Sequence, residues 1–117
     1  MLEADSPTIR EFLDAWHENG RRSFEKEYTS LNYDSPSYAK HARQRRKYIA
    51  LDEGTGGVFL VDRETQEVYT IKAYGVPKLR CGSVSYVAAR FRTETERQRA
   101  YYENPPTATR NPIPAGR

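Results

Sequence analysis

The chain has 117 residues, the size of one ordinary domain, and 37% of them are hydrophobic. No apolar run approaches the roughly 18 residues that read as a membrane span, and no basic stretch leads into an apolar run near the N-terminus, so we expect neither a membrane anchor nor secretion. The single cysteine, Cys81, excludes an internal disulfide framework and a multi-cysteine zinc site. It suits a reducing compartment, so we expect a cytoplasmic protein.

The net charge of +3 is concentrated in one segment of the chain. Five of the 19 Lys and Arg residues lie between positions 40 and 47, with no acid among them. They are Lys40, Arg43, Arg45, Arg46 and Lys47. The other 14 cationic residues are outnumbered by 16 acidic ones, so the rest of the chain is weakly negative. A segment of this kind is typical of contact with an anionic partner.

The N-terminal third predicts two or three helices. In the first, over residues 5–20, Ser6 can cap the N-terminus, Pro7 suits the first turn, and Gly20 can close the helix. Apolar side chains recur in it at helical spacing and predict one buried stripe. They are Ile9, Phe12, Leu13 and Trp16. A shorter helix is predicted over residues 23–33.

A third serine-proline start at Ser35 and Pro36 predicts another helix, over residues 34–48. This helix would carry the basic segment on its solvated side or at its exit into the first strand. Lys40, Arg43, Arg46 and Lys47 would then lie on the outside.

Strand patterns follow. Residues 47–51, 58–61, 67–74 and 83–91 predict strands, and the middle two, around a short polar turn, predict a hairpin. Gly75 and Pro77 are expected to interrupt the sheet. Thr93 and Glu96 have the spacing of a capping box, which predicts a short polar helix that ends before Pro105.

These elements predict an α+β fold over residues 1–104. Two or three N-terminal helices pack on one face of an antiparallel meander of three or four strands, and a short C-terminal helix follows. The proline-rich residues 105–117 have little to bury and are expected to form an extended tail.

The basic segment is our candidate nucleic-acid interface. Several cations within reach of successive phosphates bind polyanions, and aromatic rings beside them stack on unpaired bases. Tyr38 and Tyr48 bracket the segment, and other cations are expected nearby in the fold. The candidate residues are Tyr38, Lys40, Arg43, Arg45, Arg46, Lys47, Tyr48, Arg21, Arg22, Lys78 and Arg80. We expect DNA or RNA to be bound largely without regard to sequence.

The same charges permit other interpretations. The protein could be an adaptor or inhibitor that docks on an acidic or nucleic-acid-binding surface of a larger protein complex, with the tail ordering on that target. The segment could also be a solvated surface without a partner, and exposed tyrosines with a proline tail also suit assembly into a particle or filament.

Motifs for catalysis are weak. Asp62, Glu64, Glu67 and Lys72 resemble the carboxylate and lysine sets of metal-dependent nucleases, but they flank a turn and are better explained by turn chemistry. Cys81 lacks an activating feature for a dyad with either histidine. We therefore expect no enzyme, no cofactor and no metal.

The block GVFLVDRETQEVYTIKAYGVP, residues 57–77, resembles a hairpin found in short uncharacterised reading frames of phages and other mobile elements. It covers about a fifth of the chain. The resemblance implies a small binding protein directed at host machinery or nucleic acid, and it carries no functional residue over to this chain.

Overall fold

The computed structural model describes residues 1–103, which form two helices, one short 3-10 turn and five strands. In chain order these are α1 (Pro7–Glu27), η1 (Pro36–Tyr38), β1 (Lys40–Gln44), β2 (Tyr48–Glu53), β3 (Gly56–Asp62), β4 (Glu67–Ala73), β5 (Val76–Ser83) and α2 (Val84–Glu103). The predicted tail, residues 105–117, lies outside the described residues. Within residues 1–103 there is no helix whose length and apolar character would let it cross a membrane.

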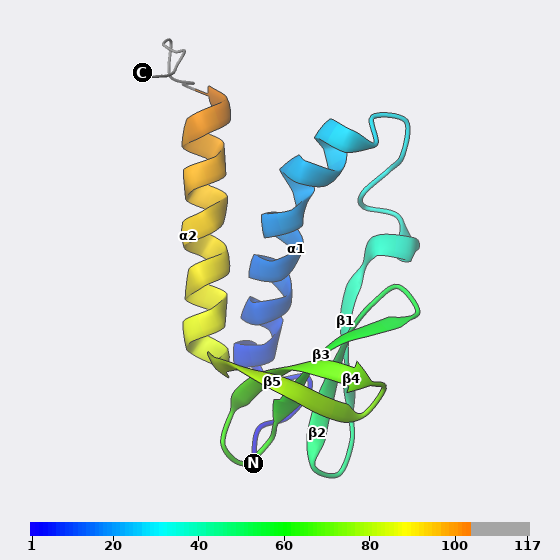
Figure 1. The fold of residues 1–117 in the computed structure, drawn as a ribbon, viewed down its shortest axis with the longest axis vertical. Helices are drawn as coiled ribbons and strands as arrows, with labels where there is room; N and C mark the ends of the chain where they lie inside the picture. The colour runs from blue at the N-terminus through cyan, green and yellow to red at the C-terminus, as the bar shows by residue number, and fades with distance from the viewer. Residues whose placement is uncertain (104–117) are drawn as a thin grey trace.

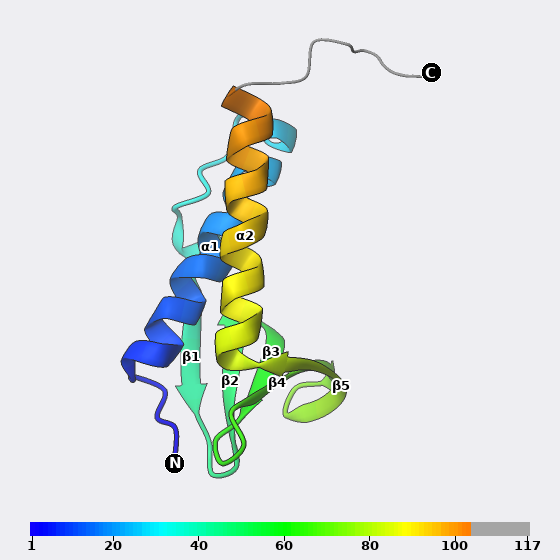
Figure 2. The same ribbon diagram turned by 90° about the vertical axis from the view of Figure 1, so that its left-hand side faces the viewer.

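The predicted α+β class is confirmed, with different numbers of elements. The strands form one antiparallel sheet in the order β1-β2-β3-β4-β5, a meander of five strands where three or four were predicted. Both helices lie on one face of this sheet and run side by side in the same direction (Figures 1 and 2). Only one of them precedes the sheet in the chain. The long helix α2 follows β5 directly.

The predicted hairpin and first helix are confirmed in their main features. β3 and β4 pair in register from Phe59 with Thr70 to Val61 with Val68. At the start of α1, the Ser6 hydroxyl accepts a hydrogen bond from the backbone of Ile9, at 3.4 Å. Apolar positions of the predicted α1 stripe are buried. They are Ile9, Phe12 and Trp16, with Leu13 partly buried beside them.

Aromatic rings join the two helices to the sheet. The ring centroid of Phe12 lies 5.9 Å from that of Phe59 on β3 and 5.7 Å from that of Phe91 on α2, both in edge-on geometry. Such pairs contribute about 0.5–1.5 kcal/mol each beyond the area they bury. Phe12 on α1 therefore joins both helices to the sheet.

The prediction that α1 ends at Gly20 is wrong, because the helix continues to Glu27 and includes the first part, residues 23–27, of the predicted second helix. Gly20 instead allows the side chain of Tyr33 to pack closely against α1. A Cβ at this position would lie 2.6 Å from the phenol oxygen of Tyr33. The Tyr33 hydroxyl donates a hydrogen bond to the carbonyl oxygen of His17, at 2.8 Å, and it occupies the space that a side chain at residue 20 would fill.

The predicted third helix is also wrong. Pro36 opens only the 3-10 turn η1, Ala39 is extended, and the chain enters β1 at Lys40. From there the side chains alternate. Ala42 packs against the core while His41 and Arg43 lie on the other face, near Asp52.

The prediction for residues 75–91 has the wrong boundary. Val76–Ser83 forms β5, which tolerates Pro77 because this strand lies at the sheet edge, and the strand predicted over 83–91 is the first part of α2. The Ser83 hydroxyl accepts from the backbone of Tyr86, at 3.1 Å, as at a helix N-cap. The buried or half-buried residues have helical spacing. They are Val84, Val87, Ala88 and Phe91. The predicted capping box at Thr93 therefore lies inside a helix.

The contact between Gly20 and Tyr33 predicts that Gly20→Ala changes the free energy of unfolding in the direction opposite to the usual one. Glycine to alanine in a helix interior normally stabilises by about 1 kcal/mol. Gly20→Ala should instead destabilise the protein, because the new methyl displaces the phenol oxygen from its hydrogen bonds. In a Tyr33→Phe background the nearest ring atom is 3.6 Å away, so the same change should stabilise. Chemical denaturation of the four proteins measures both signs, and equal effects of Gly20→Ala in the two backgrounds would contradict the explanation.

Candidate nucleic-acid interface

The β1–β2 turn presents three consecutive cations, Arg45, Arg46 and Lys47. The ladder of β1 and β2 closes with Gln44 opposite Ile49, and the backbone N–H of Arg45 donates to the carbonyl of Tyr48 at 2.9 Å. All three cationic side chains are exposed. None of them forms an ion pair with another residue of the described chain. The turn is therefore a compact patch of charge that carboxylates of residues 1–103 do not neutralise.

Arg63 fixes the backbone of this turn from behind. Its Nη1 donates to the carbonyl oxygens of Arg45 and Arg46, each at 3.0 Å. Its Nε donates to the carbonyl of Leu2 at 2.9 Å, and its Nη2 to the carboxylate of Glu3 at 2.8 Å. These hydrogen bonds hold the backbone of the turn in place. We call this set of contacts the Arg63 clamp.

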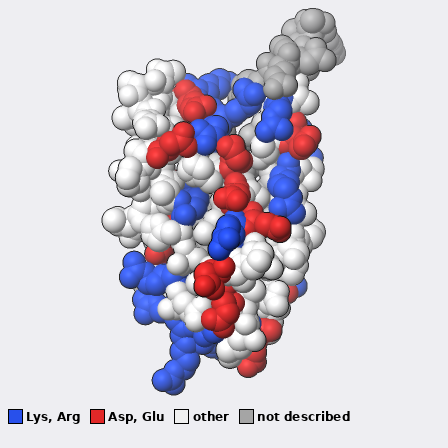
Figure 3. Space-filling model, turned by 180° about the vertical axis from the view of Figure 1, so that it is seen from behind, with Lys and Arg blue, Asp and Glu red and all other residues white. Residues whose placement is uncertain are grey.

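A concavity of about 350 Å³ opens beside the turn, and we call it the turn pocket. Two tyrosine rings meet cations there. The Arg45 guanidinium carbon lies 5.2 Å from the ring centroid of Tyr74, and the Lys47 ammonium lies 5.5 Å from that of Tyr48. The lining residues are Arg45, Arg46, Lys47, Tyr48, Leu60, Tyr74 and Gly75. Figure 3 shows the Lys and Arg side chains gathered at the lower left, the end of the molecule where Figure 1 places the β1–β2 turn.

A buried carboxylate lies next to the turn pocket. The side chain of Asp52 on β2 is 3% exposed, and its Oδ2 accepts from the hydroxyl of Tyr74 at 3.2 Å. His41 Nε2 and Arg43 Nε approach the same oxygen at 3.8 and 3.9 Å. The other oxygen, Oδ1, has no hydrogen-bond partner among the described residues. We call His41, Arg43, Asp52 and Tyr74 the Asp52 cluster.

The prediction that Lys40 lies on the surface is wrong. Its side chain is 3% exposed, and its ammonium donates to the Tyr33 hydroxyl at 3.1 Å and to the carbonyl of Tyr38 at 3.0 Å. The ammonium also lies 5.3 Å from the ring centroid of Trp16. Burial lowers the pKa of Lys40, an effect that the carboxylate of Glu53 partly offsets. Lys40 therefore belongs to the interior, far from a position where it can contact phosphate.

Tyr38 is half-buried and packs against other aromatic rings instead of beside the turn. Its ring lies 4.5 Å from that of Phe24 and 6.3 Å from that of Tyr33, centroid to centroid. Arg21 forms ion pairs with Glu18, Glu25 and Asp34, and its hydrogen bonds to Asp34 lower the pKa of that carboxyl.

The remaining candidates lie on other elements. Arg22 is half-buried on α1, Lys78 is exposed on β5, and Arg80 on β5 is paired with Glu67. The structure thus brings together Arg43, Arg45, Arg46, Lys47 and Tyr48 of the predicted set. Tyr74 and Arg63 were not among the predicted site residues. Nothing in the sequence marks Arg63 beyond its place in a polar turn.

The acids weighed for metal chemistry form an ordinary turn. Asp62 Oδ1 accepts from the backbone of Glu64 at 2.9 Å and of Thr65 at 3.1 Å, which is the geometry of an Asx turn. Among residues 1–103 no group of three or more His, Cys, Asp or Glu side chains is arranged to hold a metal ion.

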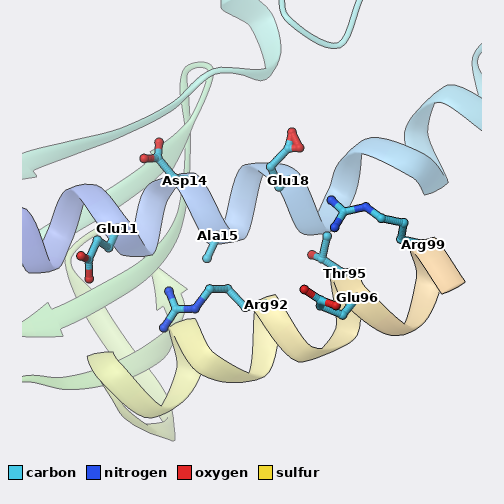
Figure 4. Close-up of a pocket in the computed structure, with 8 residues that line it drawn as sticks. All are labelled: Glu11, Asp14, Ala15, Glu18, Arg92, Thr95, Glu96 and Arg99. Atoms are coloured by element: carbon cyan, nitrogen blue, oxygen red, sulfur yellow. The ribbon is translucent and has the colours of Figure 1, made fainter.

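A second concavity, of about 570 Å³, lies between α1 and α2 (Figure 4). In the close-up Arg92 and Arg99 extend from α2 toward α1. The wall formed by α1 carries Glu11, Asp14 and Glu18. These three acids repel phosphate, so the groove is a poor site for nucleic acid.

Comparison of the chain with models of known protein families, with curated proteins and with solved structures found no match.

The Arg63 clamp predicts a large effect from a side chain that faces away from the turn pocket. Arg63→Ala should lower the free energy of unfolding by about 2 kcal/mol, because several charge-assisted hydrogen bonds are lost together. Arg97→Ala is the control, since it removes an exposed ion pair to Glu94 at 3.0 Å and should cost less than about 0.5 kcal/mol. Urea denaturation measures both variants. Equal losses would show that Arg63 is an ordinary surface residue.

The buried phenol of Tyr33 predicts a pH dependence in alkali. Burial raises the pKa of Tyr33 from 10.0 to about 12. The folded protein therefore keeps this proton where the unfolded chain loses it. The resulting stabilisation is fully present below pH 10 and disappears as the pH rises to 12. The difference in unfolding free energy between the parent and Tyr33→Phe should change in this window, to the disadvantage of the parent. A difference that stays constant from pH 9 to pH 12 would contradict the assignment.

Proposed function

We propose that this protein binds single-stranded nucleic acid through the turn pocket, largely without regard to sequence. Arg45, Arg46 and Lys47 contact phosphates, and Arg43 on the adjoining strand extends the cationic surface. Tyr48 and Tyr74 stack on bases. This proposal retains the predicted function and adds Tyr74 to the site. The predicted residues that it leaves out are Tyr38, Lys40, Arg21, Arg22, Lys78 and Arg80.

The observation that supports the proposal most strongly is the state of the three turn cations. They are exposed, adjacent and free of ion pairs with the described residues, whereas Arg21 and Arg80 are paired with carboxylates and Lys40 is buried. Affinity for nucleic acid comes mainly from cations that release counterions when they meet phosphates. A cation that already has a carboxylate partner contributes less to this release.

Single strands fit the pocket better than duplexes. A base becomes available for stacking on a side chain only when it is unstacked from its neighbours, and such stacking contributes about 1–3 kcal/mol per base. Tyr74 is 44% exposed and Tyr48 is half-buried, and both line the pocket, so a base could reach these rings by displacing the cation beside each of them. The cations beside both rings provide for the phosphates that flank a stacked base.

The second candidate is the predicted adaptor or inhibitor of a larger protein complex, with an acidic partner. The observation that favours it is the edge strand β5, where Leu79 is 62% exposed and Val76 is 45% exposed, with Lys78 between them. These exposed apolar side chains have no role in the proposed contact with nucleic acid, whereas a protein partner could bury them. Under either function we place the protein in the cytoplasm, where a lone half-buried cysteine stays reduced. The resemblance of the hairpin to phage and mobile-element proteins is compatible with both.

The proposal is tested by reversing the turn charges. Arg45→Glu, Arg46→Glu and Lys47→Glu together should abolish binding of a fluorescent oligonucleotide without loss of stability, because within the turn the Arg63 clamp contacts only backbone carbonyls. For the parent, four cations on a single strand predict a log-log slope of affinity against salt of about −2.8. Fluorescence anisotropy at several salt concentrations measures both quantities.

The matched control makes the same change of charge elsewhere. Arg92→Glu, Arg97→Glu and Arg99→Glu reverse three exposed cations of α2 and should leave binding close to that of the parent. Equal losses in the two triple variants would reduce the effect to net charge and overturn the assignment of the site. A parent that binds no oligonucleotide would leave the acidic protein partner as the remaining candidate.

A further inference from the structure

We infer that the Asp52 cluster cleaves single-stranded RNA held at the turn pocket, with His41 as the general base. This inference rests on the proposed binding function and departs from the expectation that the chain does no catalysis. It concerns residues that the binding proposal leaves unexplained, with the exception of Arg43 and Tyr74, which the two sites share.

The first argument is the cost of Asp52. A buried carboxylate oxygen without a partner costs about 1–3 kcal/mol or more, and native proteins retain few such atoms without a reason. Asp52 is 2% exposed, and its Oδ1 has no hydrogen-bond partner among the described residues. Asp52 does not line the turn pocket but is joined to it through the hydroxyl of Tyr74, and such a group beside a cationic pocket is a candidate for function. His41 and Arg43 approach Oδ2 only at 3.8 and 3.9 Å, beyond hydrogen-bond distance, so neither side chain satisfies the carboxylate by a hydrogen bond.

The second argument is the orientation of His41. It lies directly opposite Asp52 in the β1–β2 ladder, with Nε2 toward the carboxylate. A carboxylate on this side favours the tautomer with its proton on Nε2, which leaves Nδ1 as the acceptor. Nδ1 has no hydrogen-bond partner among residues 1–103, and the side chain is 45% exposed. His41 therefore offers a basic nitrogen to solvent, and Asp52 is its positioning residue. Long contacts of this kind shorten when substrate binds.

The third argument is the position of the cluster relative to the bound strand. Tyr74 belongs to both sites, because its hydroxyl binds Asp52 and its ring lies under Arg45 in the turn pocket. Arg43 is 63% exposed beside His41. His41 and Arg43 do not line the turn pocket themselves, so we place the next nucleotide of the strand beyond Tyr74, with its sugar and phosphate beside the imidazole and the guanidinium. This pairing of a base with a cation suits a reaction that builds negative charge on phosphorus.

The reaction is transesterification within the RNA. His41 Nδ1 takes the proton of a ribose 2′-hydroxyl, and the 2′-oxygen attacks the adjacent phosphorus. The new P–O2′ bond forms as the P–O5′ bond breaks, while Arg43 stabilises the charge on the phosphoryl oxygens. The departing 5′-oxygen takes a proton from water, and His41 returns its proton to the hydroxide that remains. The products are a 2′,3′-cyclic phosphate and a 5′-hydroxyl, with no oxidation or reduction.

The test uses an end-labelled single-stranded RNA and the same sequence with 2′-O-methyl groups. We expect both strands to bind, but only the RNA has the 2′-hydroxyl groups that the reaction needs. In buffer with a chelator, the parent should cleave the RNA to fragments with cyclic phosphate ends and leave the 2′-O-methyl strand intact. His41→Ala should slow cleavage by about 10²–10⁴-fold and bind the 2′-O-methyl strand as well as the parent does. Added imidazole should restore part of its rate. His41→Ala purified in parallel also controls for contaminating nucleases.

Asp52→Asn tests the positioning role and should lower kcat with little change in KM. If this variant fails to fold, Arg43→Gln provides the second measurement: its kcat at saturating RNA should fall, whereas a loss of affinity alone would change only KM. A parent that binds the 2′-O-methyl strand but leaves RNA intact would overturn the inference and preserve the binding function. Cleavage by His41→Ala at the rate of the parent would also overturn it. Absence of binding to either strand would overturn the proposed function itself.

Discussion

The hydrogen bonds of the Arg63 guanidinium hold the candidate site in position. The guanidinium joins the N-terminal segment, the end of β3 and the β1–β2 turn through hydrogen bonds to Leu2, Glu3 and two turn carbonyls. A guanidinium suits this place because its five donors have a fixed planar geometry that serves several acceptors at once. With its carbonyls bound on the inside, the turn can carry three adjacent cations outside, where like charges would otherwise favour a more open backbone.

The pleat of β1 explains why the basic segment forms two sites instead of one. Successive side chains of a strand point to opposite faces. Lys40 and Ala42 therefore face the helices, where Lys40 is enclosed by Tyr33, Tyr38 and Trp16. His41 and Arg43 face the other side and meet Asp52, and the cations after residue 44 leave the sheet altogether. One run of charge in the sequence is thus divided among the core, the Asp52 cluster and the turn pocket.

Local patterns allowed a good part of the fold to be predicted from the sequence. The α1 stripe, the β3–β4 hairpin and the α+β class depend on periodicity and turn chemistry, which act over a few residues. Gly20 was assigned as a helix end because its contact with Tyr33 is tertiary and leaves no local signal. The first turns of α2 were assigned as a strand, although Val84, Val87, Ala88 and Phe91 have helical spacing. The turn cations were predicted, but the clamp by Arg63 and the approach of Tyr74 to Asp52 depend on contacts between distant segments.

The most direct measurement of the central claim is a titration of the ¹⁵N-labelled protein with a short single-stranded oligonucleotide, followed by amide chemical shifts. The account predicts that the largest changes fall on residues 43–48 of the β1–β2 turn and on residues 74 and 75, while the α1–α2 groove stays unchanged. Changes centred on that groove or on the β5 edge, or no changes at all, would contradict it.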